Sequence, residues 1–123
     1  MFVGVLRLSF HLPGARTLKD KRQIVRSFRD RVRARLEVSI AEVEHLDLHQ
    51  RATFGVAVVS NDAQLCDELL ASVAAMAGNV RDAVLLDRGT EILTIGELAG
   101  AGLELPGKSI DWDEHEEPRD EDE

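Results

Sequence analysis

The chain has 123 residues, which is the size of one domain. Its composition, 44% hydrophobic and 31% charged, is typical of a globular protein and excludes a disordered or membrane-spanning chain. The single cysteine, Cys66, excludes a disulfide framework within the chain and a cysteine-rich zinc site.

The net charge of −8 is unevenly distributed along the sequence. Residues 1–36 carry ten basic and two acidic residues, whereas residues 37–110 carry four basic and twelve acidic ones. Residues 111–123 carry one basic and nine acidic residues, a balance equal to the net charge of the whole chain. The first 110 residues are therefore neutral in sum but polarised, and the net charge does not exclude a nucleic-acid partner.

The first half of the chain predicts a strand, a helix and two further strands. Apolar and polar residues alternate from Phe2 to Leu12, which is typical of a half-buried strand. Pro13-Gly14 indicates a turn, and Thr17 with Asp20 resembles a capping box that begins a helix. The predicted segments are a strand at 2–12, a helix at 18–36, and strands at 38–43 and 51–60.

The second half begins with a helix signal at Asn61-Asp62, with Gln64 three residues after Asn61. Apolar residues recur with the helical period as far as Gly78-Asn79, a common kind of helix end. A last extended region covers 80–95, and its turn-forming residues Asp87–Gly89 suggest a break there.

This β-α-β-β-α-β order predicts an α+β, ferredoxin-like domain over residues 1–95. Such a domain has a four-stranded antiparallel sheet with two helices on one face. Residues 96–110 are rich in glycine and are expected to form a linker. Residues 111–123 are expected to form an acidic, disordered tail.

Several runs of residues, in order along the chain, resemble one known family. They are Gly4-Val5-Leu6, the run Pro13–Arg22, the long stretch Ala41–Asp62, and Thr90-Glu91-Ile92-Leu93. Together they resemble the YlxP-like bacterial family, a domain of unknown function, over residues 1 to about 95. The resemblance implies a ferredoxin-like fold and no established activity. Its members are often encoded beside translation and ribosome-maturation factors, which suggests an association with RNA or the ribosome.

A row of cations recurs every three or four residues along the predicted first helix and therefore shares one helix face. Arginine suits phosphate because its planar guanidinium donates hydrogen bonds in pairs and is always charged. An ordinary solvated face is the alternative, since the whole chain favours arginine, with twelve Arg and three Lys. The candidate phosphate-binding residues are Arg16, Lys19, Arg22, Arg26, Arg29 and Arg33.

A polar segment, His45-Leu46-Asp47-Leu48-His49, connects the second and third predicted strands. Histidine and aspartate are good metal ligands, but three ligands so close in sequence make a strained site and no fourth is evident. We therefore expect no metal, and the segment is either a structural turn or a partner contact. The candidate partner-contact residues are His45, Asp47, His49 and Arg51.

The sheet is expected to bury Phe10 and Phe54 against the helices, because each shares the parity of the apolar residues of its strand. The opposite, open face then carries Val3, Val5, Arg7, Ser9 and His11 from the first strand and Thr53, Gly55, Ala57 and Val59 from the third. It offers no aromatic platform for stacking RNA bases. Its apolar part could instead pair two copies of the chain, and the parity of the second strand stays unassigned.

The tail contains the only tryptophan, Trp112, within an acidic segment. Its charge suggests that it folds back on the basic helix and competes with nucleic acid, and a purely solubilising tail is the alternative.

Together these features predict a cytoplasmic, non-enzymatic RNA- or ribosome-associated factor without a cofactor. The alternative is a homodimeric protein-interaction module, and a weaker one is a small-molecule enzyme that uses the loop Pro13–Thr17.

Overall fold

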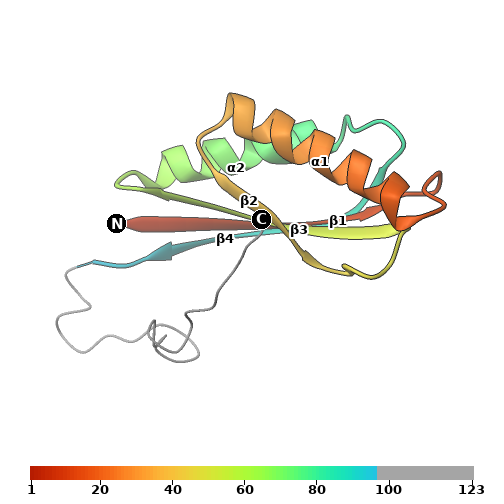
Figure 1. Cartoon of the computed structure of the whole chain (residues 1–123). Helices are drawn as coiled ribbons and strands as arrows, with labels where there is room; N and C mark the ends of the chain where they lie inside the picture. The colour runs from red at the N-terminus through yellow and green to blue at the C-terminus, as the bar shows by residue number, and fades with distance from the viewer. Residues whose placement is uncertain (97–123) are drawn as a thin grey trace, which may run out of the picture.

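The computed structural model describes residues 1–96, and Figure 1 shows their arrangement. Two helices cover one face of a sheet, and the other face is open. The predicted tail and most of the predicted linker lie outside the described residues. The elements are β1 (Phe2–His11), α1 (Leu18–Arg35), β2 (Ser39–Glu44), β3 (Arg51–Ser60), α2 (Ala63–Ala77) and β4 (Val84–Thr94).

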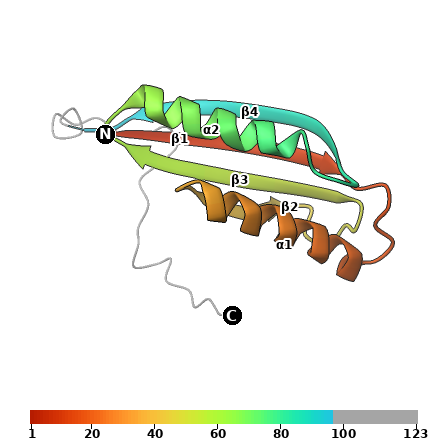
Figure 2. The same cartoon turned by 90° about the horizontal axis from the view of Figure 1, so that it is seen from above.

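The sheet has four strands in the order β2-β3-β1-β4, and all neighbouring strands are antiparallel. Seen from above, α2 lies over β1 and α1 lies towards β2 (Figure 2). The predicted ferredoxin-like fold is therefore confirmed, and β1 and β3 are the central strands.

Three phenylalanines join the layers of the core. Phe10 of β1, Phe28 of α1 and Phe54 of β3 contact one another edge to face, with ring centroids 5.2–5.8 Å apart. Edge-to-face packing is a favoured geometry for aromatic rings. The remaining core is aliphatic, as the composition requires, and Cys66 of α2 is one of its buried members.

Both helices begin at a side chain that caps free backbone amides. The Thr17 Oγ1 accepts a hydrogen bond from the amide of Asp20 at 3.1 Å, as predicted. The cap of α2 is Asp62, whose Oδ1 accepts from the amides of Gln64 and Leu65. The helix start predicted at Asn61-Asp62 is therefore confirmed, with Asp62 and not Asn61 as the cap, because the extended backbone of Asp62 places its carboxylate over these amides.

The last strand, β4, runs without a break, so the predicted interruption at Asp87–Gly89 is wrong. The irregularity lies at Leu86, because β1 residues Ser9 and Phe10 pair with Asp87 and Leu85. Pairing with the central strand β1 outweighs the turn preference of the Asp87–Gly89 sequence.

On β1 and β3, the open face carries the residues that strand parity predicts. The register also assigns β2: Ile40 is buried under the helices, and Ala41 lies on the open face opposite Gly55. A bulge at Val43 then places Glu44 on the open face opposite Thr53. All four strands therefore contribute to the open face.

Replacing Gly4 with alanine is expected to destabilise the protein. A Cβ at Gly4 would lie 2.9 Å from Leu70 Cδ1 and 3.2 Å from Cys66 Cβ, so β1 could no longer approach α2 as closely. We expect a loss of about 1–2 kcal/mol in the free energy of unfolding, measured by urea denaturation. Gly89→Ala is the matched control, since a Cβ there meets nothing within 4 Å. Equal stability of the two variants would contradict this account.

Candidate functional site

The predicted basic row lies along the side of α1 that borders β2. Lys19, Arg22, Arg26 and Arg33 are exposed on α1, and Arg16 is exposed in the turn before it; we call these five residues the basic flank. The Arg33 Nη2 donates to the carbonyl of Ile40 at 3.1 Å, which fixes this side of the helix over β2. Because all five side chains are exposed, the basic flank is available to a partner.

Arg29 belongs to the predicted row but lies deeper than the others. It is partly buried, and its Nε lies 3.6 Å from Asp30 Oδ1. Its charge is thus partly neutralised within the chain, and Arg29 is not one of the residues of the basic flank, although its spacing predicts it there.

Sequence analysis did not single out Lys21, a buried lysine of α1. It is only 2% exposed, and its Nζ lies 2.7 Å from Glu42 Oε2. The same Nζ donates to the carbonyls of His45 and Leu48 at 2.7 and 2.8 Å. The ammonium thus makes two hydrogen bonds to carbonyls and one ion pair, in which Glu42 Oε2 receives no hydrogen bond.

The helical period already places Lys21 on the buried side of α1, with Val25, Phe28 and Val32. Glu42 likewise shares a strand face with buried Ile40. A charge on an apolar face needs a buried partner of opposite charge. That requirement is the sequence signal for a buried partner of Lys21, and the register of β2 decides that the partner is Glu42.

The ammonium of Lys21 shapes the predicted partner-contact segment. Its two carbonyl partners curl residues 45–48 around it, and His45 adopts a positive φ of 63°. The His45 Nδ1 lies 2.8 Å from Thr53 Oγ1, which is 3.1 Å from Ser9 Oγ. This contact explains why Thr53 and Ser9 are buried although they lie on the open face. His45 is therefore a structural residue of the turn.

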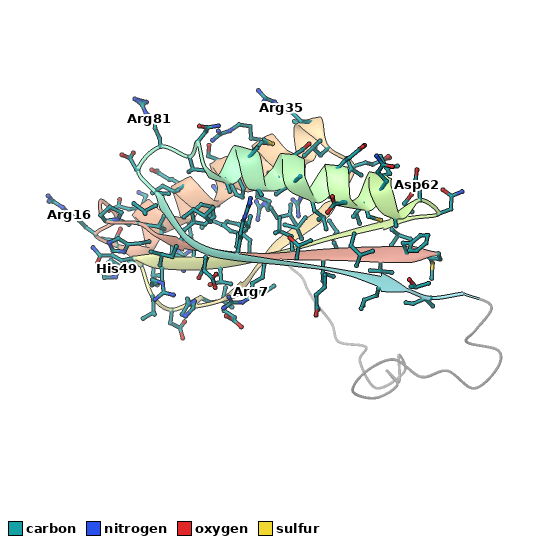
Figure 3. All side chains as sticks on the ribbon, turned by 180° about the vertical axis from the view of Figure 1, so that it is seen from behind. Arg7, Arg16, Arg35, His49, Asp62 and Arg81 are labelled. Atoms are coloured by element: carbon teal, nitrogen blue, oxygen red, sulfur yellow. The ribbon has the colours of Figure 1, made fainter. Side chains whose placement is uncertain are left out.

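The exposed part of this segment lies beside the start of the basic flank. The Gln50 Nε2 donates to the carbonyl of Ala15 at 3.2 Å, and the carbonyl of Gln50 accepts from the amide of Leu12 at 2.9 Å. Figure 3 shows Arg16 and His49 at the same end of the molecule. Asp47 and His49 are exposed there, whereas Arg51 is half-buried at the start of β3.

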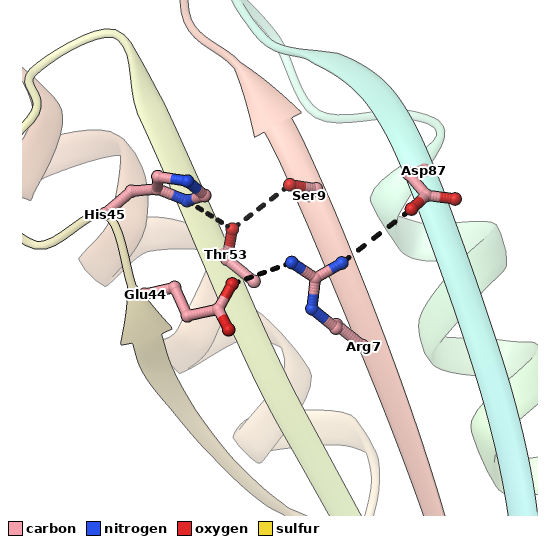
Figure 4. A network of polar contacts seen from close by, with 6 residues as sticks. All are labelled: Arg7, Ser9, Glu44, His45, Thr53 and Asp87. Carbon is pink, nitrogen blue, oxygen red and sulfur yellow. Dashed lines mark hydrogen bonds and ion pairs between the residues drawn. The ribbon is translucent and has the colours of Figure 1, made fainter.

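A polar cluster on the open face escaped the sequence prediction. The Arg7 Nη2 lies 2.7 Å from Glu44 Oε1, and its Nη1 lies 3.7 Å from Asp87 Oδ2 (Figure 4). Arg7 comes from β1, Glu44 from β2 and Asp87 from β4, so one guanidinium links three strands. The bulge at Val43 made this cluster unpredictable, because it alone turns Glu44 onto the open face.

The contact changes the acid–base behaviour of both partners. The hydrogen bond from Arg7, followed by its charge, holds the pKa of Glu44 below the ordinary range of glutamate. The same hydrogen bond, reinforced by the negative charge of Glu44, raises the pKa of Arg7. Both groups are therefore charged at neutral pH.

With this geometry established, the chain can be compared with known proteins. Residues 3–89 match a family described as a protein of unknown function, DUF503. The chain belongs to this family. Uncharacterized protein YlxP of Bacillus subtilis (strain 168) is 40% identical over 47 residues, which cover 38% of this chain and 51% of that protein. The matched segment thus spans about half of this curated relative, and the YlxP-like resemblance is confirmed.

Two further observations concern residues 1–96. Neither of the helices described there is long and apolar enough to cross a membrane. Within the same residues, no three His, Cys, Asp or Glu side chains are grouped as a metal ion would require.

Replacing Lys21 with methionine is expected to cost about 3–5 kcal/mol of unfolding free energy, because it leaves Glu42 as a shielded, unpaired charge. The double variant Lys21→Met with Glu42→Leu should recover part of this loss, and the remainder reports the two abandoned carbonyls. Urea denaturation followed by circular dichroism measures both. The exposed neighbour Lys19→Met is the control, with an expected change within about 0.5 kcal/mol. The account fails if Lys21→Met is as stable as this control.

Acid titration tests the Arg7 contact. Since the pKa of Glu44 is lowered in the folded state, its small contribution to stability is present above the ordinary glutamate range and is lost as the pH falls through the lowered pKa. Carbon NMR of the Glu44 carboxyl should show a midpoint below that of a glutamate in an unstructured peptide. In Arg7→Gln the midpoint should move up, and an unchanged midpoint would contradict the contact.

Proposed function

We propose that the protein is a cytoplasmic, non-enzymatic RNA-associated factor whose basic flank binds the phosphate backbone of ribosomal or other structured RNA. One observation carries the proposal: among residues 1–96, Lys19, Arg22 and Arg26 are exposed on one side of α1 and make no ion pair. A row of free cations on a rigid helix suits a polyanion. Arg16 and Arg33 extend the row at its two ends.

The positions of the aromatic residues support backbone contacts over reading of bases. Phe10, Phe28 and Phe54 are buried in the core, and Phe2 packs against it. Within the described part of the chain, the open face therefore offers no phenylalanine ring on which a base could stack. Contacts to phosphate position a protein on RNA but carry no sequence information. We therefore expect shape-dependent binding with little sequence preference.

The salt dependence of binding tests the proposal. With three to four phosphate contacts, the logarithm of the binding constant should fall against the logarithm of salt with a slope of about −2 to −4. Arg22→Glu with Arg26→Glu should weaken binding at least about tenfold and reduce the slope by about 1.5. Fluorescence anisotropy with ribosomal RNA fragments, together with co-sedimentation with 30S and 50S subunits, measures both.

A matched control is Arg81→Glu with Arg88→Glu, which changes the net charge equally at exposed residues outside α1. If this control retains its affinity for RNA and the α1 variant, Arg22→Glu with Arg26→Glu, loses it, the result supports RNA binding by the basic flank. Equal affinities in the two variants would overturn the proposal, as would no binding by the unaltered protein at about 50 mM salt.

The acidic tail at 111–123 is proposed to compete with RNA for the basic flank. Its charge is opposite to that of the flank, and it lies outside the described residues. A chain without residues 111–123 should then bind RNA more tightly than the full chain at low salt, with the difference fading as salt screens the charges. Equal affinities would favour a purely solubilising tail.

A homodimer through the open face is the second candidate function. The exposed valines Val43 and Val59 favour it, since apolar residues on an open sheet face are common at interfaces. The carboxylates Glu44, Asp87 and Glu91 on the same face oppose it, because a second copy would bring the same negative charges. Light scattering over a range of concentrations decides between a monomer and a dimer.

A further inference from the structure

A trough crosses the open face beside Arg7. The cross-strand neighbours of Arg7 are glycines on both sides, Gly55 on β3 and Gly89 on β4, and the row continues to Ala41 on β2. Arg7 is the only residue in this row with a long side chain, and it reaches Glu44 and Asp87 of the adjacent row. The row of small residues is thereby left uncovered.

The trough has an apolar wall and an acidic rim. It is a hollow of about 570 Å³ whose lining includes Val5, Val43 and Thr90. Val43 leans over one end, 3.2 Å from where a Cβ of Gly55 would be. A long aliphatic chain could therefore lie across the strands with apolar groups beside it.

The rim carries more negative than positive charge. Arg7 is shared by Glu44 and Asp87, and Glu44 uses Oε1 for this contact. Glu91, also in the lining, makes no ion pair with any residue in the described range. One guanidinium thus faces three carboxylates, which favours a cationic occupant.

We propose that this trough binds a lysine or arginine side chain from a basic, extended segment of a partner protein. The aliphatic stem lies along Val43 and Val5, and the charged end meets Glu91 on β4. The charges select this occupant over the others available: the chain's own tail is acidic, a second copy that pairs through its open face brings the same carboxylates, and nucleic acid is anionic. The proposal is independent of RNA binding, which uses the basic flank on α1.

The glycines allow the trough to be filled without disturbing the fold. A Cβ at Gly89 meets nothing within 4 Å, and Gly89 lies on an exposed edge strand where a β-branched residue is favourable. Gly89→Val should therefore retain the thermal stability of the unaltered protein while closing the trough. Glu91→Gln removes the free carboxylate alone, and Asp67→Asn removes the same charge from an exposed residue of α2.

The experiment uses the full chain and a labelled nine-residue peptide of alternating lysine and valine, with the glutamate–valine peptide as its counterpart. Binding of the lysine peptide should shift the amide NMR signals of Gly55 and Gly89. Its affinity should fall about two- to fivefold in Glu91→Gln and further in Gly89→Val. It should be unchanged in Asp67→Asn and in Arg22→Glu with Arg26→Glu. The affinity is read from the Gly55 amide signal, which reports the trough and not the acidic tail.

Three results would overturn the proposal. Equal affinity of Gly89→Val and the unaltered protein would place the peptide elsewhere. Movement of the Gly55 and Gly89 signals on dilution alone would make a second copy the occupant, and their movement with RNA would make it a nucleic acid. Loss of RNA binding in the α1 variant with retained peptide binding would separate the two proposals.

Discussion

The buried ammonium of Lys21 is the contact on which the arrangement of the surface depends. It ties α1 to β2 through Glu42 and holds the β2–β3 connection through two backbone carbonyls. That connection carries His45, which in turn covers the open-face hydroxyls of Thr53 and Ser9. A neutral side chain could fill the same space, but it could not form an ion pair with a carboxylate while donating to two carbonyls. The charge thus specifies one position for the loop relative to the helix.

Charge is segregated between two surfaces of the domain. The basic flank lies on the side of α1 that borders β2, on the helix-covered face of the sheet, and the acidic rim lies on the open face. A helix is about 10 Å across, whereas the Debye length at physiological salt is about 8 Å. The basic flank therefore presents positive charge to a partner, and the acidic rim presents negative charge. The net charge of −8 describes neither surface. A single small domain can in this way offer separate sites to an anionic and a cationic partner.

Much of the fold follows from local patterns that tertiary contacts reinforce. Alternation over β1, the Thr17 cap and the helical period of α1 predicted these elements nearly to the residue, because propensity and burial agree there. The misplaced break in β4, and the open choice between Asn61 and Asp62 as the cap of α2, arose where Asp, Asn and Gly suit several backbone conformations. At such positions strand pairing decides, and it depends on residues far away in the chain. The exposed members of the basic flank were predictable because helix spacing alone places them on one face.

The sequence by itself determined the order of elements, the buried faces of β1 and β3 and the row of cations on α1. These depend on periodicity and on short-range hydrogen bonds, which any local segment contains. Only the tertiary structure decided the partners of Lys21, the side on which Glu44 emerges, and the alignment of Arg7 between two glycines. Each of these depends on the register between strands, and a shift or bulge of one residue moves a side chain to the other face. The trough on the open face is a product of that register.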